Sequence, residues 1–142
     1  MGRLLAIDYG RRRCGIAVTD PLRIIATGLA TIETSKLIDW LKKYTATETI
    51  DEIIVGQPRT LDGQPSESMR YIRPGIGRVQ QALPNIPIRY YDERFTSTIA
   101  HRTIIESGIS KTRRRDKAIV DTIAATIILN DYLQSKNYNT PK

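Results

Sequence analysis

The chain is poor in the side chains that most enzymes use for covalent catalysis or for binding soft metals. Among its 142 residues there is one cysteine, Cys14, and one histidine, His101. A single cysteine cannot form an internal disulfide or a thiolate metal site, which argues against a secreted, disulfide-stabilised protein. No nucleophile–base pair can be picked out. We therefore expect any enzymatic chemistry to use water rather than a protein nucleophile.

Long apolar runs are also missing. No stretch approaches the roughly 18 apolar residues that a membrane span needs. The apolar residues between Arg3 and Asp8 are too few for a signal peptide. We expect a cytoplasmic protein that does not associate with membranes. A hydrophobic content of 40% suits one core, so we expect a single domain over residues 1–136, followed by a frayed tail over 137–142.

Positive charge is in excess. The chain has 22 Lys and Arg against 15 Asp and Glu, which gives a net charge of +7. A basic protein with a pI near 9.8 attracts polyanions through long-range electrostatics. Nucleic acid is the partner that this charge predicts.

Apolar runs and turn signals predict the element order β-β-β-α-β-α-β-α. Thr34 or Ser35 is expected to cap the first helix, and Pro74 with two nearby glycines is expected to kink or split the second. The order predicts an α/β fold with a five-stranded mixed sheet flanked by helices. Strands are expected near residues 3–7, 14–18, 24–32, 52–55 and 87–91, and helices from 34 or 35, over 66–83, 96–105 and 118–133.

Acidic residues stand where an α/β sheet places its site, beyond the carboxyl ends of parallel strands. Asp8 follows the first apolar run, although an ordinary hairpin turn also favours aspartate. Asp92 and Glu93 end the last strand, and alternation directs only one of them to the site. We favour Glu93, with Asp92 as the alternate; an exposed surface triplet with Arg94 is the simpler reading.

Asp121 is the sharpest acidic signal. It is the only charged residue between Ala118 and Leu129, and an unpaired carboxylate in an apolar helix is costly. A salt bridge to one of the arginines at 113–115 would compensate it, but a metal ion suits it better. Asp8, Glu93 and Asp121 together predict a site for Mg²⁺ or Mn²⁺, in which two ions activate water and stabilise the leaving 3′-oxygen of a phosphodiester.

Two basic clusters are candidates for binding the phosphate backbone. The second cluster could equally be a solvated charged loop. The first lies in the turn after Asp8, the second precedes the Asp121 helix, and Arg94 is a further candidate; the residues are Arg11, Arg12, Arg13, Arg94, Lys111, Arg113, Arg114 and Arg115.

Five motifs in order, AIDYG, GIAVTDP, IIVGQP, YYDERFT and VDTIAATIIL, resemble the YqgF/RuvX family over nearly the whole chain. The resemblance implies an RNase H-like fold related to RuvC-type Holliday junction resolvases. It also implies a nuclease that matures the 5′ end of pre-16S ribosomal RNA in ribosome biogenesis. The family's acidic site would fall on Asp8, on Asp92 and Glu93, and on Asp121.

The sequence hypothesis is a metal-dependent endonuclease with nucleic acid, and ribosomal particles, as partners. Resolution of branched DNA is the first alternative, and it would require a homodimer with two symmetric sites. A non-catalytic nucleic-acid-binding module is the second. A nucleotide-binding protein of the actin or sugar-kinase type shares the opening strand-Asp-x-Gly pattern, but such proteins need two domains to enclose the nucleotide.

Overall fold

The computed structural model describes residues 2–57, 68–92 and 117–139, and the account below is confined to them. The strands are β1 (Arg3–Tyr9), β2 (Arg13–Thr19), β3 (Ala26–Glu33), β4 (Ile50–Gln57) and β5 (Ile88–Asp92). The helices are η1 (Thr34–Lys36, a 3₁₀ turn), α1 (Leu37–Thr47), α2 (Met69–Ala82) and α5 (Lys117–Asn139). The expected helix at 96–105 lies outside the described residues.

The strands form one mixed sheet in the order β3-β2-β1-β4-β5. β1, β2 and β3 pair antiparallel as a meander, whereas β4 pairs parallel with β1 and β5 pairs parallel with β4. The predicted fold class, a five-stranded mixed sheet flanked by helices, is confirmed. Because β1, β4 and β5 are parallel, their carboxyl ends lie at the same edge of the sheet.

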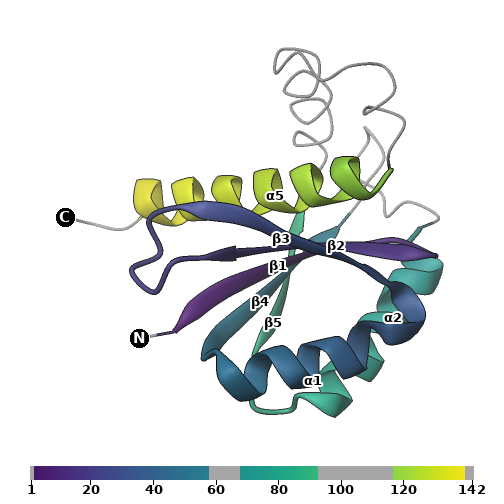
Figure 1. The fold of residues 1–142 in the computed structure, drawn as a ribbon. Coiled ribbons are helices and arrows are strands. Elements are labelled where there is room, and N and C mark those ends of the chain that lie inside the picture. The colour runs from purple at the N-terminus through teal and green to yellow at the C-terminus, as the bar shows by residue number, and fades with distance from the viewer. Residues whose placement is uncertain (1, 58–67, 93–116, 140–142) are drawn as a thin grey trace.

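Helices cover both faces of this sheet (Figure 1). α5 packs on one face, and α1 and α2 lie on the other. β1 therefore contributes to two cores: Leu5 and Ile7 belong to the α1/α2 side and Leu4 and Ala6 to the α5 side. Burial on both faces explains why the central strands are continuous apolar runs rather than alternating ones.

Strand pairing extends β1 beyond its expected end. The apolar run stops at Ile7, but Asp8 pairs with Gly15 and Tyr9 with Cys14, so the turn begins only at Gly10. β4 is likewise longer than the expected 52–55. Backbone pairing continues past the last apolar side chain because it depends on the main chain, not on side-chain polarity.

The predicted cap of the first helix is wrong. Neither Thr34 nor Ser35 caps α1; both lie in η1, and no side-chain cap hydrogen bond is present at either helix start. The Thr34 hydroxyl instead donates to the Gly10 carbonyl, 2.8 Å away in the β1–β2 turn. A tertiary hydrogen bond thus replaces the local one.

The second helix was expected to kink or split at Pro74, and it does not split, since α2 runs unbroken from Met69 to Ala82. Pro74 is exposed, while Ile72, Ile76 and Val79 are buried in the α1/α2 core. Packing of that face offsets the lost backbone hydrogen bond. α5 reaches Asn139, so residues 137–139 of the expected frayed tail are helical. None of the described helices is long and apolar enough to cross a membrane.

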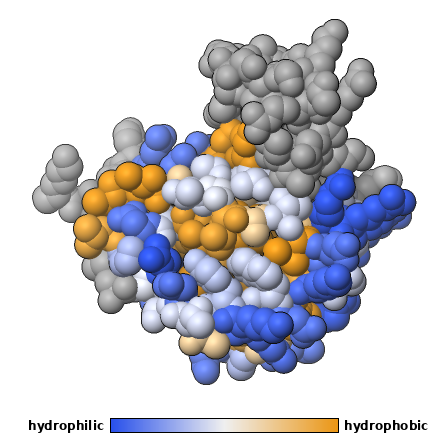
Figure 2. All heavy atoms as spheres, in the orientation of Figure 1, coloured by the Kyte–Doolittle hydropathy of each residue, from blue (hydrophilic) through white to orange (hydrophobic). Residues whose placement is uncertain are grey.

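Apolar side chains are also exposed beside β3, at the edge of the sheet. Leu22, Ile24 and Ile25 of the β2–β3 connection and Leu29 of β3 are solvent-exposed. Figure 2 shows apolar surface interrupted by hydrophilic side chains on the face turned to the viewer in Figure 1. These four side chains therefore lie outside both cores.

A buried polar contact joins α5 to β4. The Tyr132 hydroxyl donates to Glu52 Oε1 at 2.6 Å, and Arg89 Nε of β5 lies 2.7 Å from the same oxygen.

We expect Tyr132→Phe to lower the free energy of unfolding by about 2 kcal/mol, because a buried carboxylate loses a hydrogen bond. Urea denaturation followed by circular dichroism measures this loss. Tyr90→Phe, at an exposed tyrosine of β5, is the matched control and should change stability little.

The same contact predicts a dependence on alkaline pH. Burial, and then the hydrogen bond to Glu52, raises the pKa of Tyr132 above its usual value. This contribution to stability is complete below pH ~10, where unfolded tyrosine begins to ionise, and is lost as the pH rises further. Tyr132→Phe should flatten that alkaline decline; an unchanged decline would assign it to other groups.

Candidate active site

Asp8 lies on the face of the sheet that α5 covers. Along β1, Leu4 and Ala6 pack in the α5 core, and Asp8 is the next residue in that alternating series. It is half-buried, near the carboxyl end of the strand. The opposite series, Leu5, Ile7 and Tyr9, faces α1 and α2. The strand thus directs a carboxylate toward the α5 layer.

A cross-strand row connects Asp8 to α5. Asp8 is paired with Gly15 of β2, and Gly15 is paired with Thr31 of β3. The Thr31 hydroxyl is 2.8 Å from the Thr122 hydroxyl of α5, and Thr122 directly follows Asp121. Paired residues of antiparallel strands share a face, so this row and the amino-terminal part of α5 lie over the same region of the sheet. The side chain of Asp121 is outside the described set.

Glycines flank Asp8 on both neighbouring strands. Gly15 is its partner on β2, and the register Ile7–Val55 brings Gly56 of β4 alongside it on the other side. Neither glycine projects a side chain over the α5 face beside the carboxylate. A glycine inside a strand weakens the sheet, and it often marks a place where a ligand or another backbone approaches closely. This surrounding suits a carboxylate that meets a ligand.

β5 ends beside β4 at the same edge. Asp92 is its last residue and pairs with Gln57. Along β5, Tyr91 packs on the α5 side, against the ring of Tyr132, whereas Ile88 packs on the α1/α2 side. The side chain of Asp92, together with Glu93 and Arg94, lies outside the described residues. The choice between Asp92 and Glu93 therefore stays a prediction.

The first basic cluster lies in the turn that follows β1. Arg11 and Arg12 are exposed, Arg13 opens β2, and the Arg11 guanidinium carbon is 5.3 Å from the centre of the Tyr71 ring. This places three cations at the same end of the sheet as Asp8. Lys111 and Arg113 to Arg115 lie outside the described residues. Within the part of the chain described, no three acidic, histidine or cysteine side chains are grouped to hold a metal.

A family model described as "RuvX: Holliday junction resolvase" matches residues 2–135. The chain belongs to the RuvX family. It is 55% identical over 135 residues to a "Putative pre-16S rRNA nuclease" of Porphyromonas gingivalis, covering 95% of this chain and 98% of that one. It is 49% identical over 138 residues to a protein of the same name from Phocaeicola vulgatus, covering 97% and 99%.

The solved structure of T. thermophilus RuvC in complex with Holliday junction substrate matches this RuvX chain with a TM-score of 0.56. The match covers 95% of this chain and 96% of that one, at 13% sequence identity. At that identity the match shows a shared fold, the RNase H-like fold that the sequence motifs implied.

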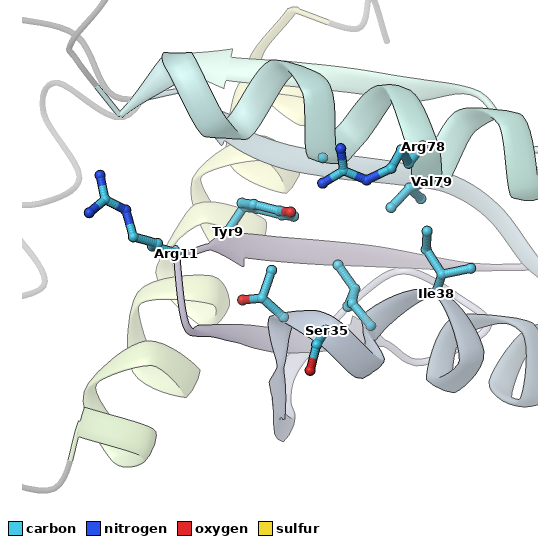
Figure 3. A pocket seen from close by; sticks show the side chains of 9 residues that line it. Tyr9, Arg11, Ser35, Ile38, Arg78 and Val79 are labelled. Carbon is cyan, nitrogen blue, oxygen red and sulfur yellow. The ribbon is translucent and has the colours of Figure 1, made fainter.

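Sequence reasoning missed two residues on the opposite face of this RuvX chain. Tyr9 and Arg78 line a pocket between β1, α1 and α2 (Figure 3). Gly75 was interpreted as a helix breaker, but a Cβ there would overlap the Tyr9 side chain. A helical glycine opposite a strand tyrosine marks a close approach. That signal could have located the pocket if the packing partner of α2 had been known.

Proposed function

We propose that this chain is a metal-dependent endonuclease that hydrolyses phosphodiester bonds during 5′-end maturation of pre-16S rRNA. The observation that carries the proposal is the position of Asp8, at the carboxyl end of β1, facing α5 and flanked by glycines. The names of the curated relatives support the substrate. The basic turn next to Asp8 supports the binding of a phosphate backbone.

The donor set fits a hard divalent cation. We assign Asp8, Asp121 and Glu93 as the ligands of Mg²⁺ or Mn²⁺, which prefer carboxylate oxygens. Even-numbered Ile88 packs against the α1/α2 core and odd-numbered Tyr91 against α5. If the alternation of β5 continues, odd-numbered residues face α5, and this favours Glu93 over Asp92 as the ligand. The bound ions would supply a hydroxide nucleophile and neutralise the developing charge on the leaving 3′-oxygen.

The chain's own residues then have distinct tasks. Asp8 orients the reacting centre from a rigid central strand rather than from a loop, which keeps its position fixed. The arginines of the turn, Arg11 to Arg13, hold phosphates on either side of the cut. We propose the same phosphate-binding task for Arg94, Lys111 and Arg113 to Arg115. Cytoplasmic location and ribosomal particles as partners belong to the same proposal.

Removal of divalent ions is expected to abolish cleavage of a pre-16S leader RNA. EDTA should reduce product formation to the uncatalysed background, and added Mg²⁺ or Mn²⁺ should restore it, because the bound ions would activate the attacking water. Denaturing gel electrophoresis of an end-labelled RNA measures both rates. RNA binding without cleavage in either metal would contradict the nuclease proposal and favour a non-catalytic binding module.

A second candidate is the resolution of four-way DNA junctions, which the family description and the RuvC fold favour. Paired symmetric cuts need a dimer with two sites related by a two-fold axis. Parallel assays on the leader RNA and on a four-way junction, with sedimentation of the protein, separate the candidates. Faster cleavage of the junction by a dimer would replace the RNA assignment.

A further inference from the structure

A pocket of about 340 Å³ lies on the face of the sheet opposite Asp8, between the start of α1 and the middle of α2. In Figure 3, Tyr9 projects from β1 toward Arg78 of α2; Val79 of α2 and Ile38 of α1 lie beyond it, and Arg11 extends from the hairpin turn on the other side, away from them. Its size falls in the range of sites that bind small molecules. It shares no lining residue with the predicted acidic site.

The pocket combines cations with an apolar lining. Arg11 and Arg78, both exposed, supply positive charge from two different elements. Half-buried Ile38 supplies apolar surface, and the fully buried Leu37 and Val79 lie behind it. No carboxylate is among the lining residues. A bare phosphate would use the arginines and leave the apolar surface unused, whereas a nucleotide uses both.

Tyr9 is held in a defined position within this pocket. Burial raises the pKa of its hydroxyl, and the nearby positive charge of Arg78 offsets this only in part. The hydroxyl is therefore neutral at physiological pH. Gly75 lets α2 approach the Tyr9 ring closely, and Arg78 lies one turn further along the same helix. The arginine therefore lies in the same pocket as Tyr9, the neighbour of Asp8 on β1.

We propose that this pocket binds one unpaired nucleotide of the substrate, with its base against the half-buried Ile38 side chain and its phosphate on Arg78. The inference rests on the proposed nuclease function and specifies its substrate. Asp8 and Tyr9 are consecutive and face opposite sides of the sheet. A strand that crosses the Arg11–Arg13 turn therefore reaches both. The preferred substrate is a duplex with a single-stranded extension beside the cut.

The test compares two RNA hairpins, one blunt and one with a single-stranded 5′ extension, by fluorescence anisotropy in EDTA. The wild type should bind the extended hairpin about tenfold more tightly, as expected for one stacked base and its phosphate. Arg78→Gln should remove this preference. Arg73→Gln is the matched control, because Arg73 is exposed on the same helix but does not line the pocket; it should keep the preference.

Equal affinity of the wild type for both hairpins would overturn the proposal, as would an equal loss for both hairpins in Arg78→Gln. Amide NMR gives a second readout with adenosine 5′-monophosphate, adenosine and inorganic phosphate as probes. Shifts at residues 34–38 and 75–79 should require the nucleotide. The same shifts with phosphate alone would overturn the nucleotide assignment. Neither measurement needs turnover, so an absence of cleavage would count against the nuclease proposal only.

Discussion

Asp8→Asn is expected to lower the metal-dependent cleavage rate on the order of 10³-fold, equivalent to ~4 kcal/mol of transition-state stabilisation. Asparagine keeps the shape of the side chain but removes the charge that would bind a divalent cation. Single-turnover cleavage of end-labelled leader RNA, at the metal concentration that saturates the wild type, measures the effect. Higher metal concentration should recover part of the rate, because the variant binds the ions more weakly.

Asp39→Asn is the matched control for this prediction. Asp39 is an exposed aspartate in the first turn of α1, on the sheet face opposite Asp8. The same chemical change there should leave the rate within about twofold, as surface substitutions usually do little. Thermal unfolding of both variants shows whether the fold is intact. Wild-type activity in a folded Asp8→Asn protein would remove Asp8 from the catalytic site.

The side of the sheet on which Asp8 lies is a structural result that the sequence alone does not supply. Local apolar runs predicted the meander and the parallel strands correctly, since these patterns depend on near neighbours. β1 is apolar on both faces, however, so alternation along it gives no orientation. Only the packing of Leu4 and Ala6 against α5 decides where the carboxylate points.

The incorrect predictions about Thr34 and Pro74 have a common physical cause. Thr34 was expected to cap a helix, and its hydroxyl instead reaches the Gly10 carbonyl of a distant turn. Pro74 was expected to kink or split α2, and the buried face of that helix keeps it from splitting. In both cases a long-range contact outweighs a local preference of about 1–3 kcal/mol. Sequence reasoning estimates the local term but not its tertiary competitor.

Packing of α5 also determines where the backbone of Asp121 lies. The first turns of α5, which include Asp121, are held over the sheet by contacts that residues further along the helix make. Ala125, Ile128 and Leu129 pack against the sheet, and the hydroxyl of Thr122 is hydrogen-bonded to that of Thr31. A Cβ at Gly28 of β3 would overlap Thr122, so the helix approaches this edge closely. The proposed acidic site would therefore depend on a core that is remote from its own charges.

Leu129→Ala is expected to lower the free energy of unfolding by about 3 kcal/mol. Leu129 is fully buried among Leu4, Ala6 and Ile54, and removing its side chain loses apolar burial and leaves a cavity. Urea denaturation measures the loss, and Leu22→Ala, at a leucine that is 69% exposed, should cost under about 0.5 kcal/mol. If Leu129→Ala cost no more than Leu22→Ala, α5 would not be anchored to the sheet as described. The position of Asp121 relative to Asp8 would then lose its structural basis.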